Sequence, residues 1–147
     1  MIYDSLEGID KRYKVLYSDP PWGFSCWSDK AQRHVTEHYE VMDFNAINSL
    51  PVSRIADDDS VLLLWATFPN LPYCLETISA WGFEYKTTAF VWVKTAKCGS
   101  LFTGMGYYTR SNAEPCLLAT RGKPLPRLSH SVHSVVMSPV GEHSRKP

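Results

Sequence analysis

The most informative stretch of the sequence is Tyr13-Lys-Val-Leu-Tyr-Ser-Asp-Pro-Pro-Trp22, a short apolar run that stops at an acid, two prolines and an indole. The first five residues alternate weakly and predict a buried strand. Consecutive prolines donate no backbone hydrogen bond and hold an extended bend, which leaves the neighbouring carbonyls free. Asp19 and the Pro20 carbonyl are then two acceptors at a strand end, with the flat face of Trp22 beside them. This set suits a planar group that carries an exocyclic amine, such as an adenine or cytosine edge. The alternative is a capped turn with Trp22 in the core.

The rest of the chain alternates strand-like and helix-like segments, which predicts an α/β sheet with right-handed crossovers. Helical spacing is expected from Asp43 to Leu50 and again before Gly82, and Asp57-Asp-Asp59 is interpreted as a solvated turn. The two strands joined through residues 95–113 are expected to form an antiparallel hairpin at one edge. Further strands are predicted at residues 61–65, 83–94, 114–120 and 132–137.

Three chemically distinctive sites lie at the carboxyl ends of predicted strands: Asp19, Trp65 with Ala66, and Lys94. Ligands of such sheets bind outside the carboxyl ends of the strands, so this edge is the expected site. Trp65 and Trp81 are assigned to the core. Two long loops, residues 23–40 and 95–113, are interpreted as substrate loops, because structureless loops of that length are usually functional.

Composition limits the class of protein. The 147 residues are enough for one domain with a real core, and the net charge is zero, although residues 74–147 hold nine basic and four acidic side chains. Any nucleic-acid contact would then be local and mostly C-terminal. The four cysteines have no metal-ligand or disulfide spacing, and no segment has the apolar length of a signal or membrane span. We therefore expect a soluble cytoplasmic protein, inside a bacterial or phage-infected host, without a metal or a membrane partner.

Short motifs occur in one order along most of the chain. They are Asp19-Pro-Pro-Trp22, His38-Tyr39, Leu63-Leu-Trp65, Trp81-Gly-Phe83, Val91-Trp-Val-Lys94, Glu114-Pro-Cys-Leu-Leu118, Arg121-Gly122 and His143-Ser-Arg-Lys-Pro147. Together they resemble the DPPW-type adenine-N6 methyltransferases. That family includes the catalytic subunit of the eukaryotic mRNA adenosine methyltransferase and related phage and bacterial DNA enzymes.

The resemblance implies a Rossmann-like sheet with a permuted motif order and S-adenosylmethionine as the methyl donor. It implies that Asp19 and the Pro20 carbonyl hold the target amino group, while Pro21 and Trp22 wall the base. Tyr39 and Glu114 match positions that line the acceptor pocket. On the donor side, the matching residues are Asp19, Ser144 and Lys146, with Lys146 near the donor's carboxylate.

The expected reaction is methyl transfer to the N6 amino group of adenine in nucleic acid, with DNA favoured over RNA. Lys97 and Arg110, in the second long loop, are candidates for contact with the substrate backbone. Two alternatives stay open. One is a non-catalytic subunit, or member of a dimer, that binds nucleic acid or a partner chain. The other is methylation of a different exocyclic amine, such as cytosine N4.

The sequence departs from the family at its end. The family's chain continues past the His-Ser-Arg-Lys-Pro motif into a segment that supplies much of the donor's adenosine pocket, whereas this sequence stops at Pro147. We therefore expect one methyltransferase domain over residues 1–147, with a loose lead-in at residues 1–12. Its sheet should be incomplete at the C-terminus, without the donor-binding segment.

Overall fold

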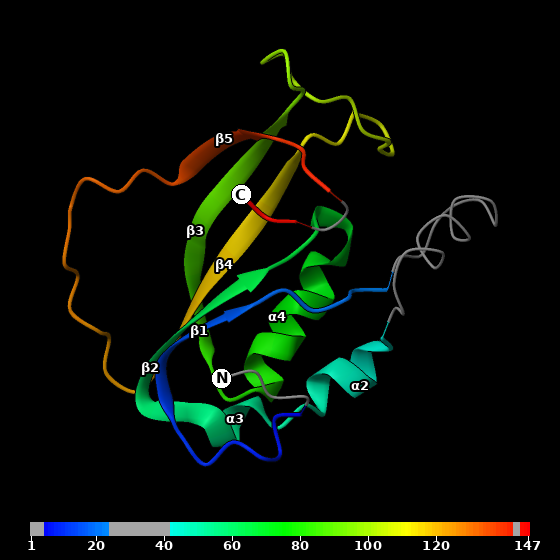
Figure 1. Cartoon of the computed structure of the whole chain (residues 1–147). Helices are drawn as coiled ribbons and strands as arrows, with labels where there is room; N and C mark the ends of the chain where they lie inside the picture. Colours follow the sequence, from blue (N-terminus) through cyan, green and yellow to red (C-terminus); the bar gives the residue numbers. More distant parts are fainter. Residues whose placement is uncertain (1–4, 24–41, 143–144) are drawn as a thin grey trace.

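The computed structural model describes residues 5–23, 42–142 and 145–147, and shows a mixed β-sheet with helices packed against it (Figure 1). The elements in chain order are β1 (Tyr13–Ser18), α2 (Phe44–Asn48), α3 (Val52–Ile55), β2 (Ala56–Trp65), the short 3-10 helix η1 (Phe68–Asn70), α4 (Leu71–Ala80), β3 (Glu84–Thr95), β4 (Ala113–Arg121) and β5 (Val135–Pro139). This arrangement confirms the predicted α/β class.

Strand direction brings distant parts of the chain to one edge of the sheet. The strands lie in the order β1-β2-β4-β3-β5. β1 is parallel to β2, and β3 is parallel to β5, whereas β4 is antiparallel to both of its neighbours. The carboxyl ends of β1, β2, β3 and β5 therefore lie at the same edge as the amino end of β4. We call this the carboxyl edge.

The β3–β4 pair is the predicted antiparallel hairpin, but its predicted place at one edge of the sheet is wrong. β4 is the central strand, and β5 pairs with the outer side of β3. The apolar character of β4 explains its position, because Cys116, Leu117 and Ala119 are buried and point alternately to the two faces.

The acidic run Asp57-Asp-Asp59 is not a free turn, as the sequence suggested, but the first part of β2. It forms an irregularity in the pairing with β1, where Tyr13 is opposite Ala56 and Val15 is opposite Val61. Partners from other segments compensate for the charges. Asp58 forms a 3.1 Å ion pair with Arg12, and Asp59 accepts a 2.7 Å hydrogen bond from the backbone of Lys123.

The main core lies between the helices and one face of the sheet. Leu62 and Leu64 of β2 are fully buried there, as are Cys74 and Ile78 of α4. The predicted helix signals are confirmed: Asp43 caps α2 by accepting a hydrogen bond from the backbone of Asn45, and α4 ends before Gly82, which has φ 81°.

The opposite face of the sheet has a smaller core. Trp65, Trp92 and Cys116 are buried there, and Val140, which follows β5, packs against them. Val15 and Tyr17 of β1 remain exposed on this side. The segment after β5 crosses back over the sheet towards the end of β1, and Figure 1 shows it in red near the C-terminus. That crossing places Lys146 at the carboxyl edge.

Candidate active site

The Asp-Pro-Pro-Trp bend after β1 is fixed by hydrogen bonds from several directions. The backbone N–H of Trp22 donates to the Pro20 carbonyl at 2.8 Å, and Met42 donates to the Pro21 carbonyl at 3.1 Å. The buried side-chain amide of Asn70 donates to the Gly23 carbonyl at 2.8 Å. The prolines supply no donors of their own, so their carbonyls serve as acceptors. The Pro20 carbonyl accepts one hydrogen bond inside the bend, and a carbonyl oxygen has a second lone pair.

Trp22 is not the exposed stacking face that the sequence suggested. Its side chain is only 4% exposed, its indole N–H donates to the Trp65 carbonyl at 2.8 Å, and its ring stacks on Phe44. A ring so placed has no free face for a base. Trp22 instead anchors the bend to the end of β2, which is the core role considered as the alternative.

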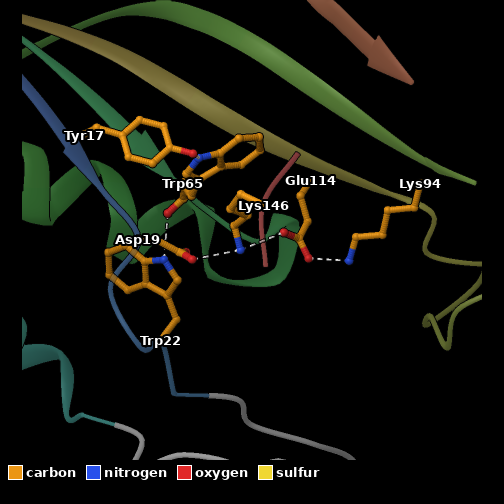
Figure 2. Close-up of polar contacts among 7 residues, drawn as sticks. All are labelled: Tyr17, Asp19, Trp22, Trp65, Lys94, Glu114 and Lys146. Carbon is orange, nitrogen blue, oxygen red and sulfur yellow. Dashed lines mark hydrogen bonds and ion pairs between the residues drawn. The ribbon is translucent and has the colours of Figure 1, made fainter. Parts of the chain in front are cut away.

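Asp19, Glu114 and Lys146 meet at the carboxyl edge (Figure 2). The Nζ atom of Lys146 lies 3.1 Å from Oδ2 of Asp19 and 3.2 Å from Oε2 of Glu114. Asp19 comes from the end of β1, Glu114 from the start of β4, and Lys146 from the segment after β5. The structure therefore brings together three residues that the resemblance assigned to the acceptor and donor sides.

A fourth residue extends this group. Lys94, near the end of β3, places its Nζ atom 2.5 Å from Oε1 of Glu114 and 5.0 Å from the centre of the Trp92 ring. Carboxylates and ammonium groups thus alternate in the order Asp19, Lys146, Glu114, Lys94, and the formal charges cancel. We call these four residues the charged row. Lys94 was noted as a strand end in the sequence but was not named as a site residue.

Partial burial and neighbouring charges shift the pKa values of two groups in the charged row and of a nearby thiol. Desolvation raises the pKa of Asp19; the Lys146 ammonium lowers that pKa but does not offset the burial. For Lys146, desolvation lowers the pKa, but the charges of Glu114 and Asp19 outweigh it, so the net shift is upward. Burial, with a further contribution from the Asp19 charge, raises the pKa of the Cys116 thiol to about 11. Cys116 is therefore a neutral neighbour of the site at physiological pH.

One carboxylate oxygen of the charged row keeps an unused acceptor position. Oε2 of Glu114 is buried and, among the described residues, accepts no hydrogen bond; its contact with Lys146 is an ion pair only. The Lys146 ammonium compensates this oxygen electrostatically, and a carboxylate oxygen has a second acceptor position that suits an N–H group.

Aromatic rings lie beneath the charged row. Nζ of Lys146 is 5.6 Å from the centre of the Trp65 ring, and the Trp65 indole N–H donates to the Tyr17 hydroxyl. Trp65 also meets Trp92 edge to face. The assignment of Trp65 and Trp81 to the core is confirmed, since both are buried. Trp65 in addition supports a site residue, which its sequence context did not indicate.

The remaining predicted site residues fall into three groups. Tyr39 and Ser144 lie outside the described residues, as do residues 24–40 of the predicted substrate loop at residues 23–40. Lys97 and Arg110 are exposed on the loop between β3 and β4, which begins and ends at the carboxyl edge. Pro21 is half-buried within the bend. Within the described ranges, no group of three His, Cys, Asp or Glu side chains is placed to hold a metal ion. None of the helices in that part of the chain is both long enough and apolar enough to cross a membrane.

Comparison with known proteins gives two matches. Residues 13–147 match the family MT-A70. The Type II methyltransferase M.MunI of Mycoplasma sp is 33% identical over 154 residues, an alignment that covers 93% of this chain and 64% of that protein. The chain therefore spans less than two thirds of the length of this relative.

Proposed function

The chain belongs to the MT-A70 family, and on this premise we propose that it transfers a methyl group from S-adenosylmethionine to the N6 amino group of adenine in nucleic acid, with DNA preferred to RNA. The observation that carries the proposal is the convergence of Asp19, Glu114 and Lys146 at the carboxyl edge. The relative's description as a Type II methyltransferase supports the reaction class.

The acceptor side is built to bind an amine. Adenine N6 is a weak nucleophile, because its lone pair is delocalised into the ring. Hydrogen bonds from its N–H groups to Asp19 and to the Pro20 carbonyl favour a pyramidal nitrogen and aim its lone pair. The fixed bend makes both acceptors rigid, so positioning and electrostatics supply the rate enhancement. If the target lies in a duplex, its base must leave the stack to reach them.

The donor side is complementary to an amino acid. An ammonium and a carboxylate 3.1 Å apart, Lys146 and Asp19, match the charges of the donor's carboxylate and amino group. When bound, S-adenosylmethionine supplies an electrophilic methyl group on a sulfonium sulfur. In our proposal Lys146 would hold the donor's carboxylate, which keeps the donor beside Asp19 and the target amine.

Methyl transfer would form a bond from nitrogen to carbon and break the bond from that carbon to sulfur, with the neutral thioether as the leaving group, and the accepting nitrogen would then lose one proton. Asp19 is the carboxylate that we propose to take it, since desolvation already raises its pKa and so favours its protonated form. The reaction therefore needs no covalent bond to the protein.

The test is incorporation of labelled methyl groups from S-adenosylmethionine into DNA and RNA oligonucleotides of matched sequence. We expect N6-methyladenine in the digested product, with more label in DNA. Asp19→Asn keeps the shape of the side chain but removes its charge, so the rate should fall by at least about 100-fold. Asp58→Asn is the matched control, because Asp58 is exposed at the opposite edge of the sheet.

Other outcomes have distinct meanings. N4-methylcytosine as the main product would show that the substrate is another exocyclic amine. Preferential labelling of RNA would reverse the proposed preference for DNA. If the folded chain binds nucleic acid but transfers no methyl group, the non-catalytic alternative is correct. Equal activity of Asp19→Asn and the wild type would remove the proposed mechanism.

A further inference from the structure

The loop between β3 and β4 exposes an unusual amount of aromatic surface. We call residues 96–112 the tyrosine loop. Tyr108 is 91% exposed and Tyr107 69% exposed, and the two rings meet edge to face with their centres 4.7 Å apart. Leu101, Phe102 and Met105 of the same loop are also exposed. Exposed apolar groups gathered in one segment are typical of an interaction site.

The tyrosine loop has a defined backbone. Its base is closed by hydrogen bonds from Lys94 to the Asn112 carbonyl at 2.8 Å and from Phe102 to the Lys94 carbonyl at 3.0 Å, and further out Gly104 donates to the Ser111 carbonyl at 3.0 Å. A side chain at Gly104 or Gly106 would overlap backbone across the loop, so these glycines permit a close approach of the two arms. The rings are therefore presented on a closed scaffold, which lowers the entropic cost of binding.

The charged residues of the tyrosine loop are all cations. Lys97 and Arg110 are its two charged residues, and the loop contains no Asp or Glu. Both side chains are exposed, and neither forms an ion pair within the described part of the chain. Cations interleaved with aromatic rings, without acids, fit a polyanion that also has flat bases better than a protein surface.

The tyrosine loop is joined directly to the charged row. Lys94 lies just before it and Glu114 just after it, and these two side chains are 2.5 Å apart at the carboxyl edge. Figure 1 shows the loop, in yellow-green, projecting beyond the ends of β3 and β4. A strand whose target base lies against Asp19 and Glu114 would pass this loop.

From these observations we infer that the tyrosine loop binds the nucleic-acid strand beside the target nucleotide: Tyr107 and Tyr108 stack on unpaired bases, and Lys97 and Arg110 contact phosphates. This inference rests on the proposed function and adds a binding surface outside the acceptor pocket. Because the two rings are nearly perpendicular, they present their faces to different bases. This stacking does not distinguish one base from another, since every base has a stacking face.

The experiment measures binding of fluorescein-labelled single-stranded DNA and RNA to the full chain by fluorescence anisotropy. Loss of one stacked base weakens binding by about 5- to 150-fold, and this is the change we expect for Tyr108→Ala and for Tyr107→Ala. Tyr85→Ala is the matched control, because Tyr85 is an exposed tyrosine of β3 at the opposite end of that strand. Its affinity should stay within about twofold of the wild type.

The phosphate contacts are tested by salt dependence. For a single strand, each lost contact reduces the slope of log affinity against log salt by about 0.7, and we expect this for Lys97→Gln and Arg110→Gln. Lys123→Gln and Arg127→Gln are the controls, since both residues follow the carboxyl end of β4, which lies at the edge of the sheet opposite the carboxyl edge. Equal changes in the two pairs would mean a diffuse electrostatic attraction and would overturn the inference.

The remaining outcomes separate this inference from the proposed function. Methyl transfer with normal affinity in both tyrosine variants would refute the inference and leave the function intact. Weakened binding in these variants, together with no methyl transfer by the wild type, would support the inference that the loop binds nucleic acid and would refute the proposed methyltransferase function. If Tyr108→Ala instead abolishes self-association in sedimentation while nucleic-acid affinity is unchanged, the loop is a protein interface and the inference is wrong. A folded wild type that binds no oligonucleotide overturns both.

Discussion

Lys146 holds its ammonium between two carboxylates, and its side chain is only 16% exposed. Its pKa in the folded protein lies above the ordinary value of 10.5. A group whose folded pKa is raised contributes stability that is complete below the unfolded pKa and is lost as the pH rises through the folded pKa. The ion pairs of Lys146 should therefore stabilise the protein at neutral pH and cease to do so only under strongly alkaline conditions.

The corresponding prediction concerns Lys146→Met. Near neutral pH this variant leaves two partly buried carboxylates without their shared cation, so its free energy of unfolding should be lower by about 1–3 kcal/mol. The difference from the wild type should shrink as the pH rises above the ordinary lysine pKa of 10.5 and the wild-type ammonium loses its proton. Urea unfolding at a series of pH values measures it, with the exposed Lys14→Met as control. A difference that is independent of pH would show that the ion pairs contribute nothing.

Lys94 contacts Glu114, and we propose that it positions this carboxylate. Its ammonium lies 2.5 Å from Oε1 of Glu114, which leaves Oε2 directed to Lys146. We predict that Lys94→Met lowers the turnover number by up to about 100-fold, because a misplaced Glu114 no longer meets the target. Lys94→Arg should restore part of the rate. The matched control is Lys86→Met, which breaks an exposed ion pair with Glu84 on the same strand. An unchanged rate in Lys94→Met would refute the positioning role.

A single residue could be predicted where the evidence for its role lay in the residues next to it in the sequence. Asp19 was identified from its place after a strand and before two prolines. The meeting of Asp19 with Lys146 cannot be derived from spacing, because 127 residues separate them, and it came from the resemblance alone. Trp22 was misjudged because an indole beside an acid looks like a stacking face, whereas its N–H finds the Trp65 carbonyl inside the protein.

Among the connecting elements, the turn after β4 has the tightest backbone. Gly122 has φ 64°, and a side chain there would overlap the backbone of Asp58. We predict that Gly122→Ala lowers the free energy of unfolding by about 1–3 kcal/mol, since both the left-handed conformation and the overlap oppose a methyl group. Gly8→Ala is the control, because nothing lies within 4 Å of a side chain there. Equal stability of the two variants in urea unfolding would contradict the prediction.

Elements with their own start and stop signals were predicted well. α4 combines inward apolar residues with a terminal glycine, and both features appear in the structure. β2 was predicted five residues too short, because three consecutive aspartates indicate a turn on local grounds. Their acceptance in a strand depends on Arg12 and on the backbone of Lys123, which the local sequence does not reveal.

At the scale of the whole molecule, stability should be concentrated in the middle of the sheet. β4 and β2 each have a hydrogen-bonded strand on both sides, whereas β1 and β5 each have one. We predict the slowest amide exchange in the central residues of β4 and β2 and the fastest exchange, among the strands, in β5. Hydrogen–deuterium exchange read by mass spectrometry tests this order. Protection of β5 equal to that of β4 would show that the sheet opens as one unit.

Strand order was the part of the fold that the sequence left least determined. Hydrophobic pattern reports how deeply a strand is buried, but it does not identify the neighbour. The two-faced apolar pattern of Cys116, Leu117 and Ala119 was the available sign that β4 is central. Insertion of an antiparallel strand between β2 and β3 also explains why Glu114 begins its strand at the same edge where Lys94 ends its own.

The crossing of the segment after β5 has a consequence for synthesis. A ribosome releases residues in chain order, so Asp19 and Glu114 emerge before Lys146 does. Until Lys146 arrives, Glu114 has the Lys94 ammonium beside it, but Asp19 has no cation, so the charged row carries one uncompensated negative charge. The charges of the charged row are therefore balanced only after Lys146 has emerged, long after Asp19.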